Sequence, residues 1–319
     1  MKKTNLLKTI IEQVNNSFLS KDRIHAEEKD YFYLYVICVL LGISLANIIL
    51  RLVMSSYSFT EWMEYFKDID YRIFVGGMEN GLQNFYDEVE GFDYPPYYLY
   101  FWYFIFFPFY ILPFNLGIYF WDLLRMILTT ITINNVSKTF KYKKNIYLFY
   151  SFTIFGYAID TFHNNTNFLI TFLLLESYIL LNRDKKWASG ILFALCTFKI
   201  NSVIFIPLLL IVKKINWRDL KYYLLPFLLL CIPYFIFPSY FLQMLGNWIY
   251  QEEDKNLLLI DAIMWKALQP PHLFFIGLLL LILLENVGDE RWRNLLRIIV
   301  PTAIIIYMIR LIIILNVPS

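Results

Sequence analysis

The sequence is poor in cysteine and histidine, with three of each among its 319 residues. Cys38, Cys196 and Cys231 all lie in apolar runs without CxxC spacing, which indicates buried thiols and gives no basis for a disulfide framework or a zinc site. The sequence also lacks a P-loop, an HExxH motif and a glycine-rich dinucleotide fingerprint. ATP hydrolysis, zinc proteolysis and redox catalysis therefore have no support in it.

Charge is also scarce, because 17% of the residues are charged and 59% are hydrophobic. The apolar residues form runs long enough to cross a bilayer, which excludes a soluble globular fold. The pattern predicts an all-α polytopic membrane protein with about eight to ten transmembrane helices. The expected spans are 31–53, 97–113, 116–136, 146–162, 167–182, a paired element within 187–212, 222–240, 269–285 and 296–316.

The expected domain organisation is simple. Residues 1–30 should form a cytosolic amphipathic segment on the membrane surface, and residues 31–319 a single transmembrane domain in contact with membrane lipids. Basic clusters at 138–144, 183–186 and 213–221 mark cytosolic loops by the positive-inside rule.

For two segments, a simple count of membrane crossings conflicts with the positive-inside rule. Residues 97–113 are short and are interrupted by prolines, so we expect that they do not span fully; the alternative places the 138–144 lysines outside. Residues 187–212 have basic clusters on both sides, which favours a helical hairpin with its turn at 198–201. A kinked single span with Lys199 snorkelling is the alternative.

The first loop, residues 54–97, is strongly acidic and is interpreted as the catalytic extracytoplasmic loop. It holds nine of the 26 Asp and Glu residues and two of the 28 Lys and Arg residues. Asp68 and Asp70 are two positions apart, so their carboxylates would point the same way on an extended segment and diverge by about 200° on a helix.

Several motifs resemble one group of membrane enzymes. Residues 67–74 (KDIDYRIF) and then 94–96 (YPP) resemble the first lumenal loop of polyprenyl-phosphate-mannose-dependent mannosyltransferases of the GT-C superfamily, above all glycosyltransferase family 87 and the first mannosyltransferase of GPI-anchor synthesis. Residues 163–167 (HNNTN) stand where such proteins have a short polar Gly-Gln or Gly-Asn motif, and residues 194–206 resemble their small-residue helix with a lysine. The similarity covers roughly residues 30–215.

The resemblance implies transfer of a hexose, mannose in the closest patterns, from a polyprenyl-phosphate donor such as dolichol phosphate to a lipid or glycan acceptor. It implies an extracytoplasmic site in the plasma membrane of a prokaryote or the endoplasmic reticulum of a eukaryote, and no nucleic-acid partner. The chain departs from the family pattern at two places: His163 and Asn164 stand where Gly-Gln is usual, and Asn201 stands near a usual proline.

The site residues follow from the matched motifs. Asp70 is the expected general base, and Asp68 would orient the acceptor or a cation. The expected substrate-binding residues are Arg72, Tyr94, His163, Asn164, Asn167, Lys199 and Arg310. No cofactor is expected; a divalent cation at the two aspartates is the only one that the pattern allows. Lys199 should lie within about 10 Å of the cavity of Asp70, the span of a sugar phosphate.

Three other functions compete with this interpretation. A transporter also places charges at membrane depth, but it predicts inverted halves that the chain does not show. An acyltransferase could use His163 and Asn164, yet it leaves Asp70 and the Tyr-Pro-Pro segment unexplained. A non-catalytic subunit of a transferase complex fits the short chain.

Overall fold

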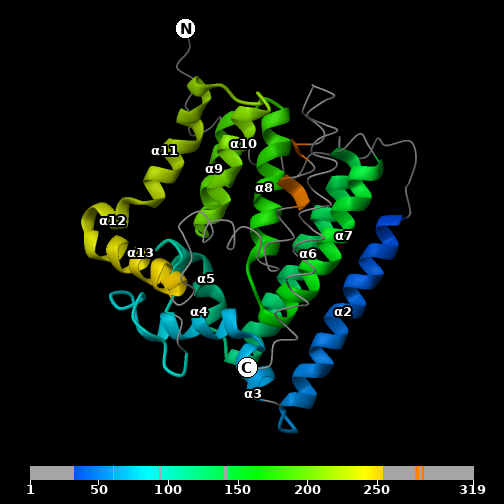
Figure 1. Cartoon of the computed structure of the whole chain (residues 1–319), viewed down its shortest axis with the longest axis vertical. Coiled ribbons are helices and arrows are strands. Elements are labelled where there is room, and N and C mark those ends of the chain that lie inside the picture. The colour runs from blue at the N-terminus through cyan, green and yellow to red at the C-terminus, as the bar shows by residue number, and fades with distance from the viewer. Residues whose placement is uncertain are drawn as a thin grey trace.

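The computed structural model describes residues 32–59, 61–92, 95–139, 143–253, 277–279 and 282–283. Within these ranges the chain is helical and contains no β-strand, which confirms the predicted all-α class. The elements, shown in Figure 1, are α2 (Phe32–Met54), α3 (Glu61–Phe66), α4 (Ile69–Glu79), α5 (Trp102–Tyr110), α6 (Phe114–Thr139), α7 (Lys143–His163), α8 (Asn167–Asn182), α9 (Lys186–Cys196), η2 (Ile200–Ile204), α10 (Phe205–Ile211), η3 (Trp217–Leu220), α11 (Lys221–Leu230), α12 (Ile232–Ile236) and α13 (Pro238–Glu253).

Helix α8 lies at the centre of the molecule. It packs against α6 on one side and α9 on the other, and 14 of its 16 residues are buried. Because α8 is buried on all sides, it forms the core around which the other upright helices are arranged. Helix α2 packs on α6 and α7 at the periphery, whereas α4 and α13 lie across the lower end of the bundle in Figure 1.

The described residues contain two helices long and apolar enough to cross a membrane, Phe32–Met54 and Phe114–Val136. Helix α5 has nine residues, or about 14 Å at 1.5 Å per residue, against a hydrocarbon core of about 30 Å. Segment 97–113 therefore does not cross as a helix, as the sequence indicated. The total of eight to ten spans stays a prediction, and segments 1–30 and 296–316 lie outside the described residues.

The expected single span at 222–240 is wrong. The chain instead forms α11, α12 and the start of α13, with breaks at Cys231 and Phe237. The cause is proline: Pro233 lies in the first turn of α12 and Pro238 opens α13. Proline lacks the N–H that would continue the preceding helix, and its ring clashes with the turn before it, so each one starts a new helix.

The predicted hairpin at 187–212 is present. Helix α9 ends at Cys196, and the chain turns through Lys199 before η2 and α10. The two outer ends of the hairpin meet the same side of the bundle, because Lys214 Nζ donates to Asn182 Oδ1 at 3.1 Å and Lys186 Nζ donates to Asp219 Oδ1 at 2.9 Å. The tip with Lys199 therefore lies at the opposite end.

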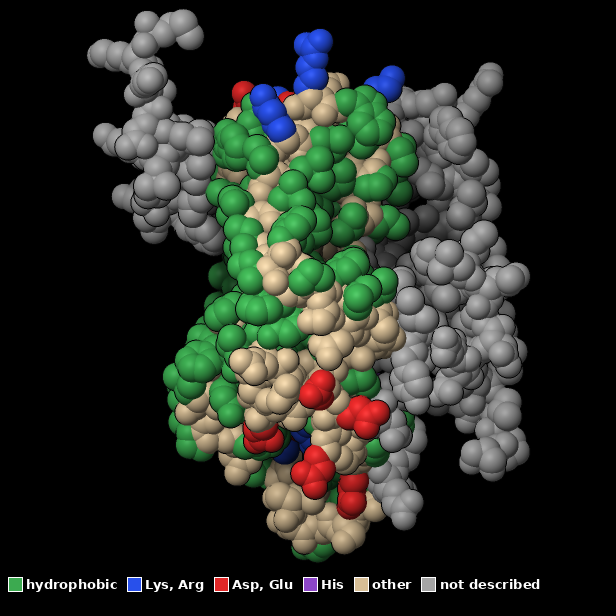
Figure 2. Space-filling model, turned by 90° about the vertical axis from the view of Figure 1, so that its left-hand side faces the viewer, with side chains coloured by type: hydrophobic (Ala, Val, Ile, Leu, Met, Phe, Trp, Pro, Cys, Tyr) green, Lys and Arg blue, Asp and Glu red, His purple; other side chains and the backbone are tan. Residues whose placement is uncertain are grey.

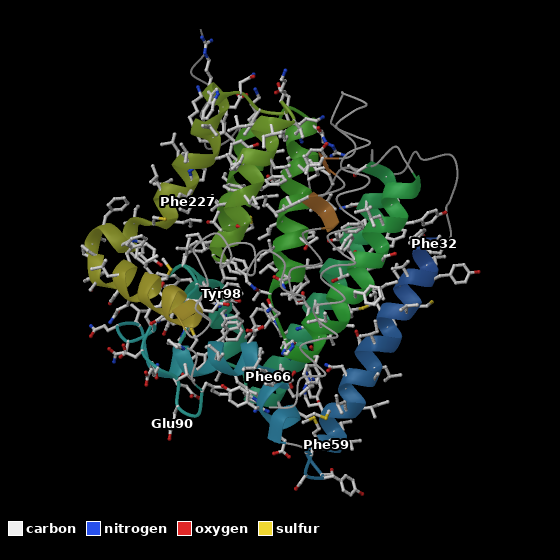
Figure 3. The ribbon with its side chains drawn as sticks, in the orientation of Figure 1. Phe32, Phe59, Phe66, Glu90, Tyr98 and Phe227 are labelled. Carbon is white, nitrogen blue, oxygen red and sulfur yellow. The ribbon has the colours of Figure 1, made fainter. Side chains whose placement is uncertain are left out.

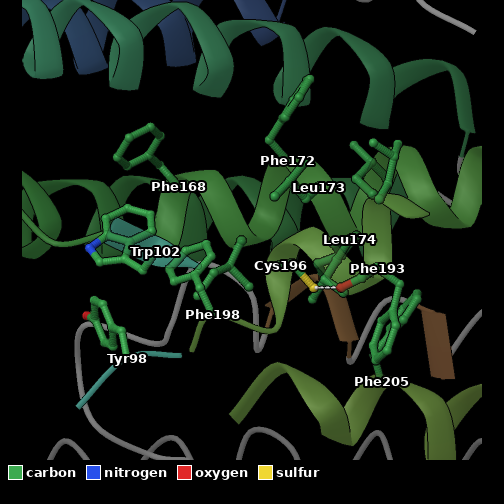
Figure 4. Packing of buried hydrophobic residues seen from close by; sticks show 14 of the residues in the cluster. Tyr98, Trp102, Phe168, Phe172, Leu173, Leu174, Phe193, Cys196, Phe198 and Phe205 are labelled. Carbon is green, nitrogen blue, oxygen red and sulfur yellow. Dashed lines mark hydrogen bonds between the residues drawn. The ribbon is translucent and has the colours of Figure 1, made fainter. Parts of the chain in front are cut away.

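Aromatic packing fixes that tip. The ring of Phe198 stacks on Trp102 with ring centroids 4.3 Å apart, and the Phe198 carbonyl accepts the Leu99 N–H at 2.9 Å. Figure 4 shows Phe198 between Trp102 and the end of α9 at Cys196. Burying two large rings against each other stabilises the position of the next residue, Lys199.

The two ends of the bundle differ in charge. Figure 2 shows exposed Lys and Arg side chains at one end and exposed Asp and Glu side chains at the other. The acidic end, which we call the site end, exposes Glu79, Asp87, Glu88 and Glu90. The opposite, basic end exposes Lys213, Lys214, Arg218 and Lys221.

Candidate active site

Asp68 initiates α4 from a left-handed backbone conformation, with φ 60° and ψ 21°. Its carbonyl accepts the Arg72 N–H at 3.0 Å, and its own N–H donates to the Phe162 carbonyl at 2.9 Å. Aspartate and asparagine tolerate this conformation better than other residues with a Cβ. The side chain makes no cap to the helix, which leaves the carboxylate free to turn away from α4.

The Asp68 carboxylate is surrounded by donors and is 3% exposed. Arg51 at the end of α2 binds it in a bidentate pair, Nε to Oδ2 at 2.9 Å and Nη2 to Oδ1 at 3.0 Å. Lys67 Nζ and Asn164 Nδ2 also donate to Oδ1, the latter at 2.7 Å. Such planar, charge-assisted contacts are among the strongest hydrogen bonds in proteins, so Asp68 is fully engaged within the protein.

The ion pairs continue into α6. Arg51 Nη1 donates to Asp122 Oδ2 at 2.8 Å, and Arg125 Nη1 donates to Asp122 Oδ1 at 2.7 Å. Arg125 is fully buried and also donates through Nη2 to Asn164 Oδ1. We call Arg51, Lys67, Asp68, Asp122, Arg125 and Asn164 the anchoring network, because it joins α2, α4, α6 and the α7–α8 turn.

The anchoring network perturbs the ionisation of its loop members. Burial disfavours the charged form of Asp68, but the hydrogen bond from Arg51 and the charges of Lys67 and Arg51 outweigh it, and the pKa of Asp68 is lowered from 3.8. Burial lowers the pKa of Lys67 to about 8, with the Asp68 charge opposing that shift. Asp68 is therefore a carboxylate throughout the neutral range.

Asp70 lies in the first turn of α4 and meets a different set of partners. Asp68 precedes the helix in a left-handed conformation, whereas Asp70 is helical, and Asp70 meets Lys199, His163 and Asn165 in place of Arg51. Its carboxylate is hydrogen-bonded by Asn165 and lies within electrostatic range of Lys199 and His163. Burial raises the pKa of Asp70 above 3.8, and these positive charges and the hydrogen bond offset only part of that effect.

Lys199 reaches the same place from the tip of the α9–α10 hairpin. Its Nζ donates to Asn165 Oδ1 at 3.1 Å and to Asn167 Oδ1 at 3.3 Å, and it lies 5.7 Å from the ring centroid of Tyr98. The side chain is 3% exposed. Figure 3 places Tyr98 inside the molecule, whereas Glu90 lies on the outer loop.

Three asparagines, two in the α7–α8 turn and one at the start of α8, connect the charged residues of the site. Asn164, with φ 57°, binds Asp68, whereas Asn165 donates to Asp70 and accepts from Lys199. One carboxamide thus joins the expected base to the expected phosphate ligand. The third, Asn167, accepts from Lys199 and donates through Nδ2 to a buried carboxylate of α7 at 2.9 Å.

Other predicted site residues are placed less centrally. His163 is partly buried near Asp70, and its Nδ1 lies 3.2 Å from the Phe66 carbonyl. The structure does not bring Arg72 to the cluster, because its Nη1 donates to the Glu64 carbonyl at 3.2 Å on the exposed side of α4. Tyr94 and Arg310 lie outside the described residues.

Sequence reasoning missed several members of the site. Arg51, Asp122 and Arg125 occur within or beside apolar runs, Asp160 precedes the polar segment 163–167, and Asn165 lies within that segment without having been assigned a role. The available signal was an ionisable residue inside a spanning segment, which indicates a functional position. For Asp122 and Arg125, spaced three apart on one helix, it was also an ion pair.

The side chains that contact Asp68 include two cations, whereas a metal ion would need anionic ligands. Among the described residues, no group of three or more His, Cys, Asp and Glu side chains could hold a metal ion. The Asp68 oxygens already accept from Arg51 and Lys67, so a divalent cation there would have to displace two positive side chains.

Comparison with known proteins gives one match. The model of glycosyltransferase family 87 matches residues 92–284, which include the Asn165, Asn167 and Lys199 cluster. No curated protein and no solved structure matches.

Proposed function

Because this chain belongs to glycosyltransferase family 87 and is a membrane glycosyltransferase, we propose that it transfers a hexose, mannose in the first instance, from a polyprenyl-phosphate donor to a lipid or glycan acceptor. The transfer inverts the anomeric centre and takes place on the extracytoplasmic face. Sugar transfer by a family member is favoured over the transport and acyl-transfer alternatives. A non-catalytic subunit would share the fold but would transfer no sugar.

The observation that carries the proposal is that Lys199 Nζ donates to Asn165 Oδ1 at 3.1 Å while the same carboxamide lies next to Asp70. The acceptor hydroxyl needs a base, and the departing phosphate needs a positive charge. The base and the positive charge must lie about the length of one sugar phosphate apart. In this site the carboxamide of Asn165 lies between them. Asp70 is accordingly the general base and Lys199 the phosphate ligand.

The reaction balances as a direct displacement. The acceptor oxygen forms a bond to the anomeric carbon as the bond from that carbon to the phosphate oxygen breaks. The hydroxyl proton passes to Asp70, and polyprenyl phosphate leaves with its negative charge facing Lys199. A fixed ammonium in a water-poor site stabilises that developing charge more than it would in water.

An apolar groove beside the site suits the prenyl chain. A cavity of about 580 Å³ is lined mainly by aromatic and aliphatic side chains of α5, α12 and α13 and by the 82–84 turn. Tyr100 lines this groove, whereas Tyr98, two positions earlier, contacts Lys199. A lipid donor could thus place its phosphate at Lys199 and its first isoprene units in the groove.

The position on the outer face is supported by charge. The basic end of the bundle exposes Lys and Arg and should face the cytosol, whereas α4, which carries Asp70, lies at the opposite end in Figure 1.

The test is a transfer assay with purified protein. Radiolabelled polyprenyl-phosphate mannose and polyprenyl-phosphate glucose are supplied separately, each with extracted membrane lipids or glycans as acceptors. We expect label to move from one donor to an acceptor and the new linkage to be inverted. No transfer from either donor by folded protein, or retention of configuration, would contradict the proposal.

A further inference from the structure

Asp160 is a buried carboxylate of α7 to which the proposed reaction gives no role. It is fully buried, and its Oδ1 accepts a hydrogen bond from Asn167 Nδ2 at 2.9 Å. Its Oδ2 has no donor in hydrogen-bond geometry among the described residues. A buried ionised carboxylate is costly unless cations face it, so the charges around Asp160 decide what it does.

Within the described part of the chain, the cations whose charges act on Asp160 include Arg125 and Lys199. Arg125 is already committed, because it pairs with Asp122 at 2.7 Å and donates to Asn164. Lys199, by contrast, donates hydrogen bonds to two neutral carboxamide oxygens, those of Asn165 and Asn167. Asp160 is thus the carboxylate available to Lys199 besides Asp70.

Asn167 connects the two groups in a fixed orientation. Its Nδ2 donates to Asp160 Oδ1, so its Oδ1 must face Lys199 Nζ, 3.3 Å away. Exchanging the amide ends would put a donor against the ammonium and an acceptor against the carboxylate. The carboxylate therefore sets the direction of the dipole that holds Lys199.

We propose that Asp160 is a positioning residue, the second counter-ion of Lys199, which acts through Asn167 to hold the ammonium charged and aimed at the donor phosphate. This inference rests on the proposed function. During transfer Asp70 accepts a proton and becomes neutral, so Lys199 loses one anion at the moment when the leaving phosphate needs its charge. Asp160 takes no part in that proton transfer, and its hydrogen bond with Asn167 keeps the carboxamide oxygen of Asn167 against Lys199.

The experiment measures equilibrium binding of radiolabelled polyprenyl-phosphate mannose to purified protein in detergent, which needs no acceptor. Asp160→Asn should raise Kd on the order of tenfold, equivalent to about 1.4 kcal/mol. In the Lys199→Met background the same substitution should change Kd by less than about twofold, because a residue that acts through Lys199 has nothing left to act on.

Two further variants separate charge from structure. Exchanging the pair, Asp160→Asn with Asn167→Asp, keeps one carboxylate and one carboxamide next to Lys199 and should restore Kd to within a few-fold of the unmodified protein. Glu176→Gln is the matched control. Glu176 is also a buried carboxylate that accepts from an asparagine, Asn135, but it lies nine residues after Asn167 along α8, about 14 Å away. The Kd of Glu176→Gln for polyprenyl-phosphate mannose should equal that of the unmodified protein.

Folded Asp160→Asn that binds the donor like the unmodified protein would overturn the inference. So would an equal loss in the Lys199→Met background, because Asp160 would then act independently of Lys199. If Asp160→Asn does not fold, donor binding is measured on the exchanged pair, Asp160→Asn with Asn167→Asp, instead. A folded exchanged pair that fails to bind the donor contradicts the charge role of Asp160. Unchanged donor binding in Lys199→Met alone would instead remove the proposed function.

Discussion

Asp70 and Asp68 are two positions apart and face different partners, so the same substitution at each should have different effects. Asp70→Asn keeps the size of the side chain and its hydrogen bond to Asn165, but asparagine cannot accept the acceptor proton. We expect the transfer rate to fall by about 10² to 10⁴-fold with no loss of thermal stability. Asp87→Asn, exposed in the same loop, is the control and should leave the rate unchanged.

Asp68→Asn should act mainly on stability. It leaves Arg51 and Lys67 close together without the carboxylate that neutralises both. Removing one partner of a buried ion pair typically costs about 3 kcal/mol or more. Thermal unfolding in detergent should show a lowered midpoint, and the folded fraction should keep measurable transfer. A variant with full stability but no transfer would give Asp68 a direct part in the chemistry.

The raised pKa of Asp70 predicts an acid limb in the rate profile. A base must be ionised, and a carboxyl whose pKa lies above 3.8 gains a proton earlier as pH falls. The rate should therefore drop on acidification at a pH above 3.8. Asp68 contributes nothing there, because its lowered pKa keeps it ionised.

His163 also faces Asp70 and, as a histidine, is a second group that can titrate at mildly acidic pH. Initial rates should be measured from about pH 4 to about pH 8, a range that includes the ordinary histidine pKa of about 6.5, in the unmodified protein and in His163→Gln. The fall of the transfer rate at acidic pH should persist in His163→Gln. Its disappearance would assign the titration to His163.

At the scale of elements, the hairpin that carries Lys199 depends on a close approach between α9 and α11. A Cβ built on Gly190 would lie 1.8 Å from the Tyr222 carbonyl oxygen, so no side chain fits unless the helices separate. Gly190→Ala should therefore destabilise the fold by about 1 to 3 kcal/mol and weaken transfer by moving the hairpin.

Gly246→Ala in α13 is the matched control, since nothing lies within 4 Å of its added Cβ. It should leave thermal stability unchanged or raise it slightly through helix propensity. Equal unfolding midpoints for the two variants would contradict the packing argument.

The acidic loop shows how packing decides the use of a short motif. Sequence reasoning left open whether segment 68–70 is extended or helical, and the structure starts a helix at Ile69. The two carboxylates therefore diverge, one into the anchoring network and one towards Lys199. An extended segment would have placed both on one side, as a cation site requires.

For the whole molecule, the separation of charge predicts the orientation in the membrane. Glu88 is exposed at the site end and Arg218 at the basic end. With a membrane-impermeant maleimide on intact cells, Glu88→Cys should be labelled and Arg218→Cys should be labelled only after permeabilisation, each compared with the unmodified chain. The reverse pattern would place Asp70 on the cytosolic side and contradict the outer-face reaction.

The sequence by itself determined the all-α class, the hairpin at 187–212 and the short segment at 97–113. Hydrophobic runs and flanking charge are local properties, and they follow directly from the energetic cost of exposing polar backbone and charge to hydrocarbon. The membrane glycosyltransferase family was also readable from the order of its motifs. Pro233 and Pro238 are also visible in the sequence as residues that break helices. The expectation of a single span at 222–240 gave more weight to the apolar composition of the segment and was wrong.

Only the tertiary structure decided which charges meet. Asp160 and Asn165 belong to the site because they lie near Lys199, which comes from the tip of the α9–α10 hairpin. Arg51 belongs to it because it pairs with Asp68. Electrostatic pairing depends on distances of a few ångströms between elements remote in the chain, and residue spacing carries no information on these distances. The division of the two aspartates between anchoring and chemistry is therefore a consequence of packing.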